Sequence, residues 1–388
     1  MELTPDAQTD TAGIDRRRLM HLSAAGVMAF AGATPLADLA QAATPEASPE
    51  ASPEASPVAS PASGASASPV VNLPDLPLEL VAILTGDDPK ATNQTGEKWS
   101  VSGTDLGSSF RYKDETWLVF GDTFGEYKAD WRSNVLGVST DTDLSDGVTI
   151  DRMIEDRPGH AKEVLASRKV DFQEMTVIPT YGVAVGDRLI LHYMSVSHWG
   201  EPGHWELGAA GFAYSDDHGE NWTKDPRAIL PGDTNWGQVA IEEHEGALYL
   251  FGIPGGRYGD LKLARVAPEA LLDLKSWEYW NGTGWSPDVA DATVIVPGPI
   301  GELSVRWNSH YQRWLMMYLI DDQGLIVLRT AESITGPWGE PRVAVRSTEY
   351  PALYAPFMYP IGNDGPDIIF NMSLFGPYNV YVMRTRLD

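Results

Sequence analysis

The sequence contains no cysteine and carries little positive charge for its 388 residues. Without cysteine there are no disulfides, thiolate zinc sites, cysteine nucleophile or lipid-modified cysteine. Lys and Arg number 28 against 54 Asp and Glu, which gives a formal net charge of −26. Because nucleic acids and anionic membrane surfaces are bound through clustered basic side chains, this balance argues against both as partners. A neutral ligand stays compatible with it.

Motifs for several kinds of site are also missing. There is no G-x-x-x-x-G-K loop and no G-x-S-x-G turn, which disfavours phosphoryl transfer and serine-esterase chemistry. The spacing of His198, His204 and His218 is irregular, unlike that of a metal site. No loop has EF-hand spacing, so a structural calcium ion has no motif behind it. We expect no organic cofactor, and the sequence leaves the metal content open.

Residues 1–43 have the order of an export signal. The run Asp15-Arg16-Arg17-Arg18-Leu19-Met20 precedes a weakly apolar segment, 22–39, and Ala40-Gln41-Ala42-Ala43 follows it. A basic start, an apolar middle and a small-residue end are typical of a secretory signal, and the paired arginines resemble a twin-arginine signal peptide. The alternative is an uncleaved membrane anchor, for which the segment is short and rich in Ala and Gly. We therefore expect a secreted or cell-surface protein.

Residues 44–79 contain few large apolar side chains that could be buried in a core. Glu-Ala-Ser-Pro and then Ala-Ser-Pro repeat as far as about residue 69. This composition predicts a disordered, extended linker that holds the following domain clear of the cell surface. A spacer with no further role is the alternative.

Residues 80–388 predict an all-β domain. Short apolar runs rich in Val, Ile, Tyr, Phe and Trp alternate with Gly, Asp, Asn and Pro, the pattern of strands and turns. The runs group into five units, at 103–140, 178–222, 237–280, 302–338 and 355–385. Repeated units of about four short strands indicate a five-bladed β-propeller. A two-sheet sandwich is the alternative.

Two further expectations concern the closure of the ring and the one predicted helix. The fifth unit lacks a clear fourth strand, and Leu80 to Leu84 has the composition to supply it and close the ring. Pro268 to Leu274 is the one segment that predicts a helix, with proline in its first turn.

The segment from Ser215 to Trp222 matches S-x-D-x-G-x-x-W, the Asp-box turn of sialidase-type blades. Its Asp can accept hydrogen bonds from turn amides and its Trp can pack between sheets. We expect a structural role for it and assign it no catalysis.

Two carboxylates are the main candidates for chemistry. Asp105 lies between Gly103 and Gly107 on the expected inner strand of the first unit, and Asp122 follows the next strand, 117–120. Ends of neighbouring antiparallel strands lie side by side, so the two carboxyl groups are expected within a few ångströms. Glycoside hydrolysis uses such a pair. The alternative for Asp122 is turn formation beside Gly121.

Further candidates lie at strand ends and in longer loops. Glu174 and Glu302 begin later inner strands. Either could be a third carboxylate that tunes the pKa of the pair or binds sugar hydroxyls, and the alternative for each is an acid at a strand end whose hydrogen bonds are satisfied within the protein. His192 faces either the channel or the core. The full set of expected substrate-binding residues is Glu174, Glu302, Asn134, Trp131, His192 and Tyr354.

Several of these motifs together resemble a known family. They are Thr85-Gly86, Ser102 to Gly107, Phe120 to Gly125, Arg132-Ser133-Asn134 and Tyr214 to Gly219. The domain resembles a secreted bacterial family, long known only as a domain of unknown function and now associated with endo-D-arabinanase activity on mycobacterial arabinogalactan and lipoarabinomannan. The resemblance implies a five-bladed propeller that cleaves internal α-D-arabinofuranosyl linkages. It implies that Asp105 and Asp122 are the catalytic carboxylates, and it leaves open which of them is the general acid and which is the nucleophile or base.

The leading hypothesis is therefore a secreted, monomeric glycoside hydrolase. Its expected partner is a neutral furanose polysaccharide such as D-arabinan, with no nucleic acid and no membrane-spanning partner. Two alternatives stay open: a non-catalytic carbohydrate-binding or wall-attached propeller, and an exo-acting furanosidase or sialidase-like glycosidase. The sialidase reading is weakened because no arginine triad for a sialic acid carboxylate is evident at inner-strand positions.

Overall fold

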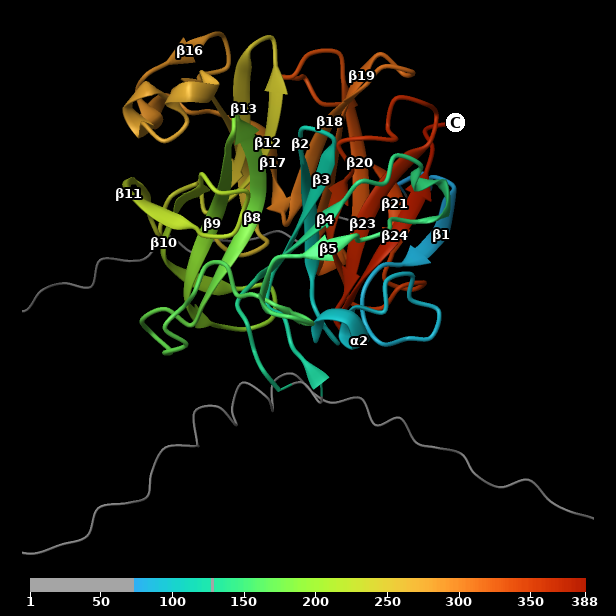
Figure 1. Ribbon diagram of the computed structural model, residues 1–388. Helices are drawn as coiled ribbons and strands as arrows, with labels where there is room; N and C mark the ends of the chain where they lie inside the picture. The colour runs from blue at the N-terminus through green and yellow to red at the C-terminus, as the bar shows by residue number, and fades with distance from the viewer. Residues whose placement is uncertain (1–72, 127–128) are drawn as a thin grey trace, which may run out of the picture. The chain divides into compact units, whose positions relative to one another are not determined.

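The computed structural model describes residues 73–388 except 127 and 128 (Figure 1). The expected export signal, 1–43, and most of the expected linker lie outside the described residues. In the described ranges no helix is both long and apolar enough to cross a membrane.

The described strands form five antiparallel sheets that follow one another along the chain. Blade 1 contains β2 (Leu106–Tyr112), β3 (Glu115–Phe120), β4 (Val135–Ser139) and β5 (Arg152–Met153). Blade 2 contains β8 (Thr176–Val185), β9 (Arg188–Trp199), β10 (Trp205–Ser215) and β11 (Thr223–Pro231). Blade 3 contains β12 (Gln238–His244), β13 (Ala247–Ile253), β14 (Gly259–Val266), β15 (Glu278–Trp280), β16 (Trp285–Ser286) and β17 (Val294–Ile300).

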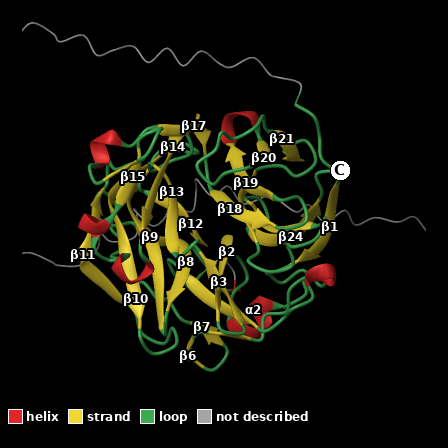
Figure 2. Cartoon of the chain, turned by 90° about the horizontal axis from the view of Figure 1, so that it is seen from above, coloured by secondary structure: helices red, strands yellow, loops and turns green. Residues whose placement is uncertain are grey.

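The last two blades complete the ring, and a small hairpin stands apart from it. Blade 4 contains β18 (Leu303–Asn308), β19 (Arg313–Ile320), β20 (Leu325–Ala331) and β21 (Arg342–Arg346). Blade 5 contains β22 (Leu353–Met358), β23 (Ile368–Leu374), β24 (Asn379–Thr385) and β1 (Leu78–Ile83). The hairpin pairs β6 (Glu155–Arg157) with β7 (His160–Ala161). The fold is the predicted five-bladed β-propeller, and Figure 2 shows its sheets around a common axis.

Strand β1 closes the ring, as predicted from Leu80 to Leu84. It pairs antiparallel with β24, with Leu78 opposite Thr385 and Ile83 opposite Tyr381. The chain enters the domain slightly earlier than expected, because Asp75 bridges Val343 and Leu76 is buried. Residues 73–79, expected as the end of the linker, therefore already belong to the folded domain.

The innermost strands fill the axis of the propeller. Figure 2 shows β2, β8, β12 and β18 nearest the centre. A cavity of only about 10 Å³ lies there, and its lining consists of Leu106, Thr180, Met194, Gln238, Val239, Glu302, Leu303 and Phe357. Such a volume holds about one water molecule. A polymeric ligand therefore has to bind at a face of the ring rather than inside its axis.

The prediction of a helix over Pro268 to Leu274 is wrong. The segment forms two single 3₁₀ turns, Pro268–Ala270 and Leu274–Ser276. Asp273 lies between them and accepts a hydrogen bond from the Lys275 amide, which starts a new turn instead of continuing the first.

Among the described residues, the one α-helix is α2 (Thr95–Trp99), which the sequence pattern did not indicate. The remaining short helices are 3₁₀ turns at Leu144–Asp146, Val289–Asp291 and Asp321–Gln323.

The turn from Ser215 to Trp222 uses its polar groups internally. Asp217 Oδ1 accepts a hydrogen bond from the Asn221 amide at 2.8 Å, and the Trp222 indole donates to the Gly219 carbonyl at 2.9 Å. Hydrogen bonds from Asn221 and Ser215 lower the pKa of Asp217 to about 2. These contacts are those of a turn that holds two strands together.

Candidate active site

Asp105 and Asp122 lie at the same edge of blade 1. Asp105 directly precedes β2, and Asp122 follows β3 by one intervening residue, Gly121. The strands are antiparallel, with Leu106 opposite Phe120, and the Gly121 amide donates to the Asp105 carbonyl at 3.1 Å. The start of the inner strand and the end of the second strand thus bring both acids to one face of the propeller.

Gly121 separates the two acids and permits their close approach. A Cβ atom at this position would lie 2.4 Å from Asp105 Oδ1, well inside van der Waals contact. The Asp105 carboxyl group therefore packs directly against the backbone that leads into Asp122. A side chain at position 121 would displace it.

Two tyrosines of blade 5 hold the Asp105 carboxyl group. Tyr354 and Tyr378 each donate a hydrogen bond from the phenol oxygen to Asp105 Oδ2, at 2.9 Å in both cases. Asp105 is 7% exposed, and both tyrosines are buried. The expected substrate-binding residue Tyr354 therefore does lie at the site. Tyr378 joins it because it immediately precedes β24, and its carbonyl accepts a hydrogen bond at 2.8 Å from the amide of Thr104, the residue before Asp105.

Asp122 is oriented by side chains on its other side. The Trp131 indole donates to Asp122 Oδ1 at 2.9 Å, and the Thr176 hydroxyl donates to the same oxygen at 2.7 Å. Thr176 begins β8, so blade 2 contacts Asp122 as blade 5 contacts Asp105. Asp122 is only 2% exposed. Trp131 was also expected at the site, and its ring stacks on Phe124 at a centroid distance of 6.5 Å.

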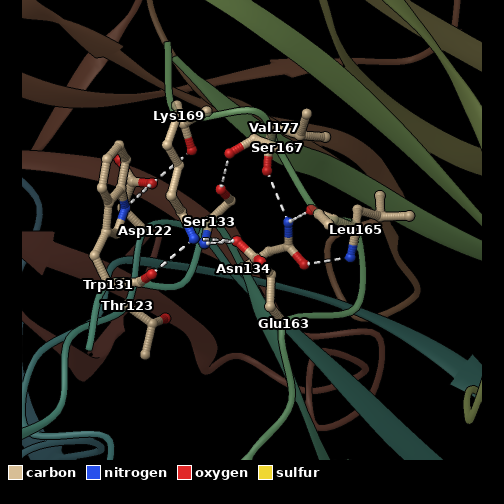
Figure 3. Close-up of polar contacts among 12 residues, drawn as sticks. Asp122, Thr123, Trp131, Ser133, Asn134, Glu163, Leu165, Ser167, Lys169 and Val177 are labelled. Carbon is tan, nitrogen blue, oxygen red and sulfur yellow. Dashed lines mark hydrogen bonds and ion pairs between the residues drawn. The ribbon is translucent and has the colours of Figure 1, made fainter. Parts of the chain in front are cut away.

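A lysine fixes the loop that carries Trp131. Lys169 donates to the Trp131 carbonyl at 2.8 Å and to Glu163 Oε1 at 2.9 Å. Glu163 Oε1 also accepts from the Ser133 amide at 2.8 Å. Figure 3 shows this network leading from Glu163 through Lys169 to Trp131 and Asp122. The indole is therefore held in position from both its ring and its backbone.

Asn134 does not belong to the ligand-binding surface, contrary to the sequence-based prediction. Its side chain is completely buried. Nδ2 donates to the carbonyls of Leu165 and Val177, and Oδ1 accepts from the amides of Val164 and Leu165 (Figure 3). These contacts use both amide hydrogens and both lone pairs of the side chain. Asn134 joins a loop of blade 1 to β8 and has no hydrogen-bonding group left for a substrate.

His192 is likewise a core residue, so the prediction that it binds substrate is wrong. It is fully buried on β9, where Nδ1 pairs with the Thr180 hydroxyl at 2.7 Å and Nε2 with the Trp236 carbonyl at 3.1 Å. Its ring also packs against Phe212. Burial lowers the pKa of His192 to about 3.

Glu174 is paired with side chains of blade 2. Its Oε2 accepts from the Ser195 hydroxyl at 3.1 Å and lies 3.5 Å from the ammonium group of Lys224. Lys224 is on β11, the outermost strand of blade 2. Among the two readings of Glu174, these contacts favour the satisfied strand-end acid.

Glu302 lies at the mouth of the axis in an ion pair. Arg257 Nη2 is 2.8 Å from Glu302 Oε1, and Arg257 Nη1 is 3.0 Å from Asp321 Oδ1. The guanidinium carbon of Arg257 lies 4.9 Å from the ring centroid of Tyr354. Since Tyr354 donates to Asp105, the Glu302 cluster adjoins the aspartates through Arg257 and Tyr354.

Arg257 and Asp321 are not among the site residues predicted from the sequence. Both follow the second strand of their blades, as Asp122 follows β3 in blade 1. The segment Gly255-Gly256-Arg257-Tyr258-Gly259 also repeats the pattern of a functional residue next to glycine seen at Gly121-Asp122. Aligning the ends of the second strands across all five units is the signal that finds them.

No group of three or more His, Cys, Asp or Glu side chains in the described part of the chain is arranged to hold a metal ion. The carboxylates near the site pair instead with Arg257, with tyrosines, and with Trp131 and Thr176.

The fold and the site define a five-bladed β-propeller with two buried acids at one face. The chain belongs to the family described as Domain of unknown function (DUF4185), whose model matches residues 90–384. It is 29% identical over 305 residues to Notoamide biosynthesis cluster protein J of Aspergillus sp. (strain MF297-2), a match that covers 71% of this chain and 79% of that protein.

Two solved structures share the fold. One is a proposed hydrolase from Bacteroides ovatus, with a TM-score of 0.55, 13% identity, and coverage of 74% of this chain and 86% of that chain. The other is an exo-beta-1,3-galactanase from Phanerochaete chrysosporium, with a TM-score of 0.50, 10% identity, and coverage of 80% and 64%. At these identities the likeness is one of fold alone.

Proposed function

We propose that the protein is an exported glycoside hydrolase that cleaves internal α-D-arabinofuranosyl linkages of D-arabinan. The observation that supports this proposal is the pair of buried acids, Asp105 and Asp122, at one edge of blade 1. Each is held by hydrogen bonds from a different neighbouring blade. Catalytic groups have to be held in a fixed geometry by neighbouring side chains, and these hydrogen bonds supply that positioning.

The pair has the groups that glycoside hydrolysis requires. One carboxylic acid protonates the leaving oxygen of the glycosidic bond, while the other carboxylate attacks the sugar or activates a water molecule. Tyr354, Tyr378, Trp131 and Thr176 position the two groups in this proposal, because their hydrogen bonds fix the rotamers of the aspartates. Groups held in place before the substrate arrives lose little entropy during reaction.

The surroundings of the pair suit a sugar polymer. Phe124, Trp131, Phe375 and Tyr378 form a chain of ring contacts beside the aspartates. Aromatic rings can stack on the C–H faces of sugars while polar neighbours bind the hydroxyls. Arg257 is paired with two carboxylates, so it offers no free charge to an anionic sugar. These features support a neutral glycan as the substrate.

Replacement of either acid tests the proposal. Asp105→Asn and Asp122→Asn should each reduce the release of reducing ends from purified arabinogalactan by at least about a hundredfold, because an amide cannot exchange the proton or act as the nucleophile. Asp114→Asn, at the exposed hairpin turn between β2 and β3, is the matched control and should keep wild-type activity. Thermal denaturation checks that all three variants are folded.

The possible results separate the proposal from its rival. Full activity in both site variants would refute the assignment of the pair. Binding of arabinan by the wild type with no new reducing ends would instead identify a carbohydrate-binding propeller. Oligosaccharide products of several lengths support internal cleavage, whereas release of single sugars alone would indicate an exo-acting enzyme.

Export belongs to the same proposal and rests on the arginine motif at residues 16 and 17. Fusion of residues 1–79 to a reporter that matures in the cytoplasm should deliver it across the membrane. Arg16→Lys combined with Arg17→Lys should keep the reporter inside the cell, and export of this double variant would contradict a twin-arginine signal.

A further inference from the structure

A second cluster of polar and aromatic side chains lies on the same face of the propeller, over blades 2 to 4. Arg257 and Tyr258 come from the loop between β13 and β14, and Asp321 follows β19. His204 ends the connection between β9 and β10, and Trp205 begins β10. The Arg257 amide donates to the Gly203 carbonyl at 3.0 Å, which joins the loops of blades 2 and 3. The cluster is therefore built from loops that are joined to each other by a backbone hydrogen bond.

Tyr258 presents a fixed aromatic surface. Its ring lies parallel to the His204 ring, with centroids 4.3 Å apart and an interplanar angle of 10°. Its hydroxyl donates to Asp321 Oδ2 at 3.0 Å. The residue is nevertheless 39% exposed. His204 therefore supports one face of the ring while part of the residue stays open to solvent.

The ion-paired groups beside Tyr258 are one cation, Arg257, and two carboxylates, Glu302 and Asp321, so the set has a net charge of −1 and leaves no positive charge free for an anionic ligand. Arg257 is ion-paired with Glu302 and Asp321, at 2.8 and 3.0 Å. A carboxylate offers about four lone-pair positions, so Asp321, which accepts from Arg257 and Tyr258, can also accept from a ligand hydroxyl. The Trp205 indole N–H is buried and has no acceptor among the described residues, and its ring lies 5.6 Å from the guanidinium carbon of Arg257.

The cluster is connected to the aspartates through two side chains. Arg257 contacts the Tyr354 ring, with the guanidinium carbon 4.9 Å from the centroid, and Tyr354 donates to Asp105. A sugar on Tyr258 would therefore lie beyond the sugars at the aspartates, along the same face. Another exposed stack, Phe172 on His198, contacts Asp171 rather than this connection.

We propose that Tyr258, backed by His204, is the platform of a distal subsite that binds a neutral furanose residue of the same chain, away from the bond that is cleaved. Asp321 accepts a hydrogen bond from a hydroxyl of that sugar. This inference rests on the proposed function. It also gives a structural reason for internal cleavage, because a polysaccharide that extends past the aspartates on this side gains contacts with the protein instead of being blocked sterically.

Kinetics with substrates of different length test the subsite. For Tyr258→Ala, the KM for the longest D-arabinan oligosaccharides should rise about tenfold with little change in kcat, which is the size of effect expected from one lost ring contact. The shortest cleaved oligosaccharide should be unaffected, because it does not reach Tyr258. Tyr258→Phe keeps the ring and should retain a KM within about threefold of wild type.

Trp307→Ala is the matched control. Trp307 is exposed to a similar extent, 36%, but lies near the other end of β18, away from the start of the inner strands. This variant should show wild-type KM values at every length. An unchanged KM for long oligosaccharides in Tyr258→Ala, or an equal rise at all lengths, would overturn the inference.

Calorimetric binding of the same oligosaccharides distinguishes this inference from the proposed function. If the wild type binds them without cleaving them, the proposed function fails, and weaker binding of long chains by Tyr258→Ala still supports the subsite. Equal binding by the two proteins overturns the subsite. If the wild type neither binds nor cleaves D-arabinan fragments, both are overturned.

Discussion

Each aspartate of the site depends on donors from a neighbouring blade. Tyr354 and Tyr378 of blade 5 bind Asp105, and Thr176 of blade 2 binds Asp122. Hydrogen bonds from two donors fix the rotamer of each carboxyl group. Without these donors, an aspartate at the end of a strand could rotate freely. The chemistry at these residues therefore depends on how blades 5, 1 and 2 meet.

His192 makes the stability of the protein dependent on pH. Burial lowers its pKa to about 3 in the folded protein, whereas an unfolded histidine binds a proton near pH 6.5. Between these two values the unfolded state holds the extra proton, so stability is fully present above pH 6.5 and is lost as the pH falls. The free energy of unfolding should decrease by about 2 kcal/mol from pH 7.5 to pH 5.0 because of this residue.

Urea denaturation at the two pH values measures this effect. His192→Gln keeps groups that can pair with Thr180 and the Trp236 carbonyl but does not titrate, so its loss between pH 7.5 and 5.0 should be smaller than that of wild type by about 2 kcal/mol. His310→Gln, at an exposed turn, serves as the control and should follow wild type. Equal pH dependence in His192→Gln and wild type would contradict the burial argument.

Strand β1 is the element on which closure of the ring depends. It covers the outer edge of β24, and the ladder extends from Leu78 opposite Thr385 to Ile83 opposite Tyr381. An ion pair between Glu79 and Arg384, at 2.7 Å, crosses the same junction but is too exposed to contribute much. Backbone pairing and the burial of apolar side chains between strand and blade therefore hold the ends of the domain together.

Removal of β1 should destabilise the domain strongly. A protein that starts after Ile83 loses the fourth strand of blade 5, at a cost of about 5 kcal/mol in hydrogen bonds and apolar burial. Its melting temperature should fall by about 10 °C. The uncovered edge of β24 should also promote self-association, which light scattering would detect.

A shorter deletion provides the comparison. A protein that starts at Val70 keeps the whole of the compact unit from Val70 to Asp388 and should melt at the wild-type temperature. If both deletions melt together, β1 does not close the ring in the manner described.

The acidity of the whole molecule predicts how its ligand binding responds to salt. With a formal net charge of −26, an interaction that depended on charge would change steeply with ionic strength. Binding of neutral arabinan through rings and hydroxyls should change by less than about twofold between 50 and 500 mM NaCl, as calorimetry can measure. A steep dependence on salt would instead indicate a charged ligand.

Much of the fold was predictable from local patterns. Apolar runs between turn residues indicated the strands, and the missing strand of the fifth unit indicated closure by Leu80 to Leu84, which β1 confirms. The prediction of a helix at Pro268 to Leu274 was wrong because the Asp273 side chain accepts from the Lys275 amide and starts a new turn. The apolar periodicity of the sequence does not reveal this side-chain contact. The start of the domain was also expected too late, since the Leu76 amide pairs with the Val343 carbonyl of blade 4, a contact between distant parts of the chain that local patterns do not reveal.

The candidate site was likewise predictable only in part. The positions of Asp105 and Asp122 at the ends of adjacent strands follow from the sequence, because strand pairing is local and a hairpin necessarily brings its ends together. Burial and partners do not follow from it. Asn134 and His192 are consumed by the core, while Tyr378 and Arg257 reach the site from blades distant in the chain. Only the closed ring determines the contacts of Tyr378 and Arg257, since Tyr378 meets Asp105 across 273 residues of sequence and Arg257 meets a tyrosine of another blade.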